Sequence, residues 1–149
     1  MNVYQIKPPT YLLIAILLVI ALNFLLPIMI LIPSPWTLIG LLPLVAGLAI
    51  DLRADRAFHL VGTAVCPFEA ASALVTDGPY RWTRNPMYLG FVLVLIGVSV
   101  LLGSLTPFVI VAAFAVLLDL RFVRMEEQEL AATFGIQWDL YKQRTRRWL

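Results

Sequence analysis

Four apolar stretches without charged side chains constrain the fold of this chain more than any other feature. Residues 11–32 run for 22 positions with no charge, which is enough to cross a hydrocarbon core of roughly 30 Å as a helix. Residues 37–50, 87–105 and 108–118 are the other three stretches. Only 13% of the residues are charged, whereas about a quarter are charged in soluble proteins. The sequence therefore predicts an all-α integral membrane protein.

These stretches predict about four transmembrane helices arranged in two hairpins. Pro27 is expected to kink the first helix, because proline interrupts the backbone hydrogen bonds of a helix interior. The second stretch, residues 37–50, is short for a span. We therefore expect its helix to be kinked near Pro43 or to continue past Asp51. The tight turn at 33–35 joins the first two helices, and a turn at 103–107 joins the last two.

The placement of basic residues predicts the orientation in the membrane. All eleven lie in the N-terminus, the middle segment or the C-terminal part, and the turns at 33–35 and 103–107 carry none. Because segments rich in lysine and arginine stay in the cytosol, both termini and the middle segment are predicted to be cytosolic. The polar segment 51–86 and the segment after the fourth helix therefore lie on one side of the membrane and can meet.

The stretch 76–90 concentrates polar, aromatic and helix-terminating residues between a charged segment and an apolar helix. Asn85-Pro86 predicts a helix start, because asparagine is a good N-cap and proline is tolerated at the first helical position. Such a start would direct free backbone N–H groups at a ligand in front of it. The simpler interpretation is a capped entry into the membrane, with Tyr80, Trp82 and Tyr88 as interfacial anchors.

Several common chemistries have no sequence motif here. The chain has no phosphate-binding loop, no glycine-rich dinucleotide loop and no HExxH or GxSxG sequence. Its single cysteine, Cys66, excludes an internal disulfide, and the isolated His59 makes a metal site improbable. No acidic residue is expected deep in a span, which argues against a proton-coupled carrier. The polar side chains expected to meet at the cytosolic face are Tyr80, Asn85, Tyr88, Arg124, Glu126, Glu127, Tyr141 and Arg144.

Residues 74–80 (LVTDGPY), residues 84–90 (RNPMYLG) and residues 126–141 (EExxLxxxFGxxWxxY) occur in this order. This combination resembles the superfamily of isoprenylcysteine carboxyl methyltransferases and phospholipid methyltransferases, in particular its small bacterial members. The upstream Gly62-Thr63 and Pro67 also fit. The resemblance implies one domain, residues 1–149, with an N-terminal hairpin (1–50) and a motif-bearing catalytic part (62–147). It further implies a membrane enzyme, in a bacterial inner (plasma) membrane, that binds S-adenosyl-L-methionine at the cytosolic face.

The resemblance assigns roles by position and implies no metal. Its cofactor contacts fall on Ala73, Leu74, Val75, Tyr80, Asn85, Pro86, Met87, Tyr88 and Glu126. Its catalytic residues fall on Arg124, Asn85 and Glu127, and its substrate contacts on Arg121, Arg124, Tyr141 and Arg144. For Arg124, an ion pair with the glutamates is the alternative interpretation. For Tyr141 and Arg144, the alternative interpretation is membrane anchoring.

The methyl acceptor stays open at this point. Carboxyl methyltransferases of the superfamily usually carry histidine where this chain has Asn85, and Trp138 replaces the usual tyrosine. Asparagine cannot titrate near neutrality, so a base at this position is not expected. A lipophilic acceptor with a carboxylate or thiol, as in an isoprenylcysteine, is one expectation, because an amine must first lose a proton. A phospholipid amine is the alternative, since the asparagine form resembles phospholipid N-methyltransferases. A non-catalytic membrane scaffold or carrier subunit is the rival of another class.

Overall fold

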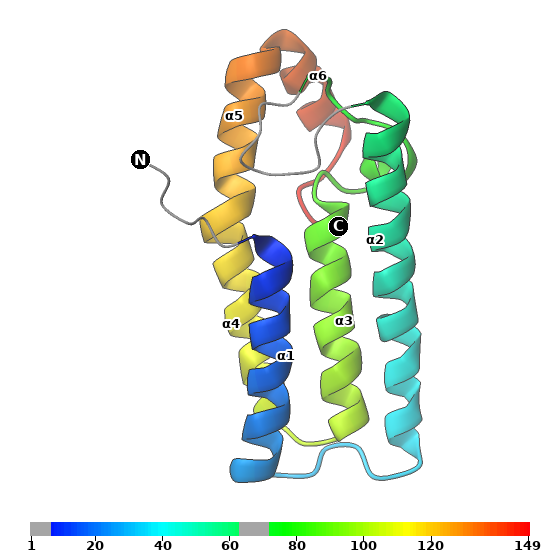
Figure 1. The fold of residues 1–149 in the computed structure, drawn as a ribbon, viewed down its shortest axis with the longest axis vertical. Coiled ribbons are helices and arrows are strands. Elements are labelled where there is room, and N and C mark those ends of the chain that lie inside the picture. The colour runs from blue at the N-terminus through cyan, green and yellow to red at the C-terminus, as the bar shows by residue number, and fades with distance from the viewer. Residues whose placement is uncertain (1–6, 63–71) are drawn as a thin grey trace.

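The structure is a computed structural model that describes residues 7–62 and 72–149, and within these ranges every regular element is helical (Figure 1). Thr63, Cys66 and Pro67 lie outside the described residues, so the expectations placed on them stay untested. In chain order the elements are α1 (Pro8–Leu25), the 3-10 helix η1 (Trp36–Gly40), α2 (Leu41–Val61), the 3-10 turn η2 (Gly78–Arg81), α3 (Pro86–Leu102), α4 (Thr106–Leu118), the π-helical turn η3 (Asp119–Val123), α5 (Arg124–Phe134) and α6 (Ile136–Arg144).

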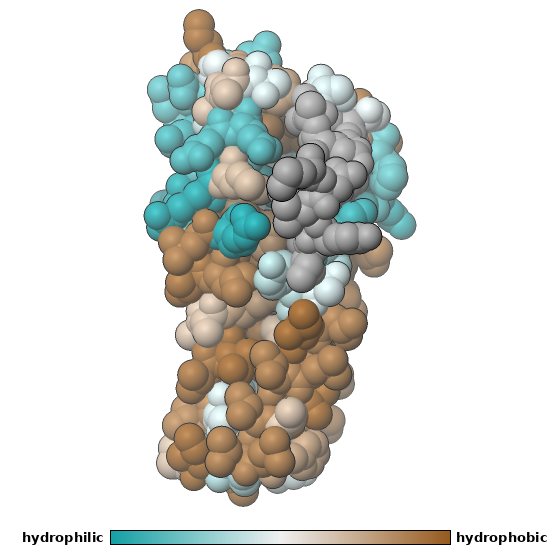
Figure 2. All heavy atoms as spheres, turned by 60° about the vertical axis from the view of Figure 1, so that its left-hand side comes forward, coloured by the Kyte–Doolittle hydropathy of each residue, from teal (hydrophilic) through white to brown (hydrophobic). Residues whose placement is uncertain are grey.

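The helices confirm an all-α integral membrane protein. Pro8–Leu25, Trp36–Val61 and Thr106–Phe134 are long and apolar enough to cross a membrane, and Pro86–Leu102 is a shorter apolar helix beside them. Figure 2 shows an apolar surface around one end of the bundle, whereas hydrophilic side chains gather at the other end. We refer to these as the apolar end and the polar end.

Two details of the predicted helices are wrong. Helix α1 ends at Leu25, so Pro27 follows the helix instead of kinking it. The backbone beyond it bonds elsewhere: the N–H groups of Leu31 and Ile32 donate to the Gly103 carbonyl oxygen at 2.8 and 3.0 Å. Helix α2 continues past Asp51 to Val61, which confirms one of the two expectations for this helix. Asp51 therefore lies inside a candidate span, contrary to the expectation that no acidic residue would.

Helices α2 and α3 pack with their backbones in close contact. A Cβ atom added to Gly47 would lie 2.6 Å from the Gly90 carbonyl oxygen, and one added to Gly40 would lie 2.5 Å from that of Gly97. Glycine is required at such approaches because any side chain would push the backbones apart. Helix α1 packs on α3 and α4, and the connection from α1 to α2 passes below α3 (Figure 1). Helix α3 is thus the central helix of the bundle.

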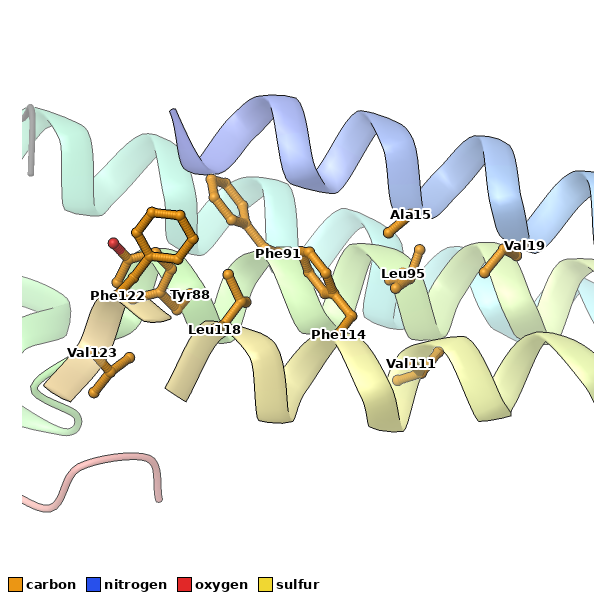
Figure 3. Packing of buried hydrophobic residues seen from close by; sticks show 10 residues of the cluster. All are labelled: Ala15, Val19, Tyr88, Phe91, Leu95, Val111, Phe114, Leu118, Phe122 and Val123. Atoms are coloured by element: carbon orange, nitrogen blue, oxygen red, sulfur yellow. The ribbon is translucent and has the colours of Figure 1, made fainter. Parts of the chain in front are cut away.

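A buried apolar cluster joins α1, α3 and the helix formed by α4 and η3 (Figure 3). Val19, Leu95 and Leu118 are fully buried in it. At the polar end the cluster ends in aromatic rings. The ring centroids of Phe122 and Tyr11 lie 5.3 Å apart in an edge-to-face arrangement. The apolar core therefore extends directly up to the first turn of α3, where the polar groups begin.

Helix α4 continues through η3 into α5 without a break. The five residues of η3 form a π-helical turn, a local widening of the helix. Helix α5 ends at Phe134, and Gly135 follows with a positive φ of 49°, as expected for a glycine at a helix C-terminus. Helix α6 then turns back over the polar end (Figure 1).

The contact between α2 and α3 leads to a first prediction. Gly47→Val should lower the free energy of unfolding by about 2 kcal/mol, since the new side chain meets backbone atoms of α3 that cannot move without separating the helices. Ala46→Val is the matched control, because Ala46 is the preceding residue of α2 and is exposed. Thermal unfolding in detergent, followed by circular dichroism, measures both. Equal unfolding of the two variants would contradict the close packing.

Candidate functional site

Two segments distant in sequence meet at the polar end, as predicted. The N–H of Arg84 donates to the carbonyl oxygen of Arg146 at 2.8 Å. The hydroxyl of Tyr141 donates to the carbonyl oxygen of Tyr80 at 2.8 Å. Figure 1 shows the C-terminal tail returning to the start of α3. The first and last motifs of the sequence therefore form one structure around this helix terminus.

Helix α3 begins at Pro86 with Asn85 as the residue before it, which confirms the predicted start. The side chain of Asn85, however, makes no capping hydrogen bond to the helix. Its Nδ2 group instead donates to the carbonyl oxygen of Arg147 at 3.2 Å. The side chain is buried and holds the tail, so among the described residues the N-cap side chain leaves the first N–H groups of α3 uncapped. Such groups favour an anion.

Tyr88 and Glu126 connect α3 with α5. The hydroxyl of Tyr88 donates to Oε1 of Glu126 in a short hydrogen bond. The Tyr88 ring stacks on Phe122 with centroids 6.1 Å apart. Tyr88 is 6% exposed, so its interpretation as an interfacial anchor is wrong, whereas Trp82 is 73% exposed and fits that interpretation. The pair forms a fixed link between the two motifs.

Tyr80 lies in a second apolar cluster between η2 and α2. It is buried with Val75 and Ala54, and its ring meets that of Phe58 edge to face at 5.5 Å. Burial raises the pKa of Tyr80 well above its usual value, and the nearby carboxylate of Glu126 raises it further. The phenol therefore stays protonated at neutral pH. Tyr80 is also not an interfacial anchor, because its side chain faces the protein.

Glu127 is held between two arginines. Its Oε1 accepts hydrogen bonds from Nε and Nη2 of Arg84 at 3.1 and 2.9 Å, and its Oε2 accepts one from Nη2 of Arg147 at 2.6 Å. The side chains of Arg84 and Glu127 are only 8% and 10% exposed. Both carboxylate oxygens are thus occupied by guanidinium groups. This pair joins α5, the segment before α3 and the C-terminal tail.

Arg84 also holds the backbone around the end of α6. Its Nη1 donates to the carbonyl oxygen of Thr145 at 2.5 Å, and its guanidinium lies 5.8 Å from the centre of the Trp138 ring. Burial raises the pKa of Tyr141, and the charge of Arg84 acts in the opposite direction. Tyr141 is buried, so it does not anchor the protein in the membrane.

The remaining predicted substrate contacts are exposed arginines. Nε of Arg124 donates to Oδ2 of Asp119 at 2.9 Å, so the ion pair of Arg124 is made with Asp119 and not with the glutamates. Arg121 and Arg144 are exposed. Asp119 also accepts a hydrogen bond from Nε1 of Trp148 at 3.3 Å. These contacts place the π-helical turn beside the end of the tail.

The other predicted cofactor contacts surround the start of α3. Ala73, Leu74 and Met87 are partly buried, and Val75 and Pro86 are buried. Sequence reasoning missed five candidates: Arg84, Arg147, Asp119, Asp51 and Thr83, whose hydroxyl donates to the carbonyl oxygen of Arg147 at 2.9 Å. Arg84 and Thr83 lie within the stretch 76–90 and could have been found there. The other three depend on contacts between segments that the sequence separates.

Sequence comparisons identify relatives of the chain. Residues 36–137, more than half of the chain, match the family of phospholipid methyltransferases. Over 74 residues the chain is 35% identical to the protein-S-isoprenylcysteine O-methyltransferase of Schizosaccharomyces pombe. That alignment covers 48% of this chain and 30% of the relative, so the similarity spans less than a third of the yeast protein. No solved structure matches the chain.

The two arginines on Glu127 lead to a second prediction. Glu127→Gln should lower the free energy of unfolding by about 3 kcal/mol, since it leaves the buried Arg84 without a counter-charge. Asp77→Asn is the control, because Asp77 and Arg81 form an ion pair at 3.0 Å with both side chains about three-quarters exposed. Such surface pairs contribute about 1 kcal/mol or less. Chemical denaturation in mixed micelles compares the two. A smaller effect of Glu127→Gln than of Asp77→Asn would contradict the assignment.

Proposed function

Because the chain belongs to the phospholipid methyltransferase family, we propose that it transfers a methyl group from S-adenosyl-L-methionine to a lipophilic acceptor that enters from the bilayer. One observation carries this proposal: the hydrogen bond from Tyr88 to Glu126, two residues 38 positions apart, joins the motif at 84–90 with the motif at 126–141. The proposed site lies at the polar end. The positions of the eleven basic residues support placing this end at the cytosolic face. Residues 62–147 would carry the site within a single domain.

The donor set fits the proposed cofactor, which supplies a methyl group on a cationic sulfonium and leaves as S-adenosyl-L-homocysteine. Glu126 presents a partly buried carboxylate that is hydrogen-bonded to a phenol, unlike the neighbouring Glu127. It would accept hydrogen bonds from the amino or ribose groups. The uncapped first turn of α3 suits a carboxylate. The rings of Tyr80 and Tyr88 would face the cation, which an aromatic π-face stabilises.

The other predicted site residues would position the cofactor and the acceptor. We propose that Ala73, Leu74, Val75, Pro86 and Met87 form the apolar surroundings of the cofactor. For Asn85 and Glu127, the contacts support positioning roles, since both side chains hold other parts of the chain. Arg121, Arg124 and Arg144 would meet the head of the acceptor, because they are exposed at the polar end. Tyr141 would hold Tyr80 in place, because its hydroxyl donates to the carbonyl oxygen of Tyr80.

A carboxylate or thiol, as in an isoprenylcysteine, is one candidate for the acceptor group, and a phospholipid amine is the alternative. The similarity to an isoprenylcysteine O-methyltransferase favours the first of these, because that relative is named for transfer to an isoprenylcysteine. A carboxylate or thiolate needs no base before methyl transfer, whereas an amine must first lose a proton. Transfer gains chiefly from holding the nucleophile close to the methyl carbon in a site without water.

Binding of S-adenosyl-L-homocysteine tests the proposal. Glu126→Gln should weaken its affinity by about 10- to 100-fold, since a hydrogen bond to a charged partner is lost. Tyr88→Phe should weaken it less, because phenylalanine keeps the stacking on Phe122. Glu129→Gln, at an exposed position of the same helix, should bind like the wild type. Calorimetry on the full chain in detergent and in lipid measures these affinities. No binding by the folded wild type would favour a non-catalytic scaffold.

A further inference from the structure

The carboxylate of Asp51 is an unusual feature of the membrane-embedded helix α2. Among the residues that the structure describes, its Oδ1 is the one buried side-chain oxygen or nitrogen without a hydrogen-bond partner. Buried polar groups are nearly always paired. An ionisable residue within a membrane span is costly and, as a rule, functional. A purely structural role would give this oxygen a partner within the protein. Because the described residues supply none, its position favours a ligand as the partner.

The fold provides room for this carboxylate at α3. Asp51 lies against Gly90, where an added Cβ would overlap the carboxylate. Gly90 follows Pro86 by four residues, so it lies about 6 Å further along α3 toward the apolar end. Tyr80 connects this level to the proposed site, because the charges of both Glu126 and Asp51 add to burial in raising its pKa. Asp51 is therefore on the bilayer side of the cluster formed by Tyr80, Tyr88 and Glu126.

We propose that Asp51 receives the protonated amine of a lipid acceptor and removes its proton before methyl transfer. The proposal rests on the function proposed above and specifies its substrate class. An unpaired carboxylate at this depth attracts an ammonium group and repels a carboxylate or thiolate acceptor. It also supplies the base that an amine requires, which the sequence did not reveal. The bilayer side is where a lipid headgroup would enter, whereas the cofactor candidates lie nearer the polar end.

The proposed step moves one proton to Asp51 and one methyl group to the acceptor nitrogen. Asp51 takes one proton from the ammonium nitrogen and leaves a neutral amine with a lone pair. That lone pair forms the N–C bond to the methyl carbon of the sulfonium donor, while the C–S bond breaks and its electron pair stays on sulfur. The nitrogen regains a positive charge, and Asp51 releases its proton to water. An aspartate in this role touches the substrate and is a catalytic residue.

Binding of a simple amphiphile tests Asp51 without the cofactor. Decylammonium should bind the wild type about tenfold more tightly than Asp51→Asn, since the variant loses a charge-assisted contact. Decanol, which has the same tail without the charge, should bind both alike. Asp55→Asn is the matched control, because Asp55 lies one turn further along α2 and pairs with the exposed His59 at 3.4 Å. Equal affinity of decylammonium for the wild type and Asp51→Asn would overturn the proposal.

Methyl transfer provides the second measurement. With labelled cofactor, the wild type should methylate phosphatidylethanolamine in vesicles in preference to a farnesylated N-acetylcysteine. Asp51→Asn should lose about 100-fold of this activity, as expected when a general base is removed, and should keep its affinity for S-adenosyl-L-homocysteine. Loss of that affinity with intact decylammonium binding would overturn the proposal and assign Asp51 to the cofactor.

Two further outcomes separate the proposals. If decylammonium binding depends on Asp51 but no cofactor binds, the amine site stands and the methyltransferase proposal fails. Folding is controlled by thermal unfolding: Asp51→Asn should unfold at the same or a higher temperature than the wild type, because the buried oxygen Oδ1 has no hydrogen-bond partner among the described residues to lose. A lower unfolding temperature would show that the carboxylate is paired within the protein and would overturn the proposal.

Discussion

The carboxylate of Glu127 is the interaction on which the polar end depends. A buried charge is tolerated only where its partners are complete, and here two guanidinium groups supply them. One belongs to the segment that precedes α3 and the other to the C-terminal tail. The uncapped start of α3 is therefore held in place by charges around it. Two adjacent residues of α5 have different contacts. Glu127 is bound by the two arginines, whereas Glu126 accepts a hydrogen bond from Tyr88.

The close contact of α2 with α3 has a second effect besides packing. Glycines at the interface let the two backbones approach, and the same absence of a side chain at Gly90 admits the carboxylate of Asp51. Because glycines line the contact, the acidic side chain of Asp51 fits against the central helix α3 while the two backbones stay close. In a membrane, where helices associate through packing and polar contacts, this arrangement combines stability and chemistry in one interface.

Most of the fold could be predicted from the sequence, because long uncharged stretches have few alternatives in a membrane. The start of α3 at Asn85-Pro86 and the meeting of both polar segments followed from local signals and charge placement. The position of Asp51 against Gly90 did not, since the continuation of α2 past Asp51 was only one of two expectations and the contact depends on how α2 packs on α3. Contacts of the tail, such as Arg147 with Glu127, depend on the path of the chain after α6. No local pattern determines that path.

The π-helical turn at η3 gives the molecule an unequal tolerance of changes in length. Each residue of an α-helix advances the side-chain direction by about 100°. A deletion in a regular part of α4 or α5 would rotate everything beyond it by that angle, and the glutamates would leave their partners. A deletion within Asp119–Val123 would instead be absorbed, because the π-helical turn holds one residue more than a regular turn and can close to a regular one. Length variation in relatives of this chain should therefore avoid the regular parts of α4 and α5 and be tolerated at the π-helical turn.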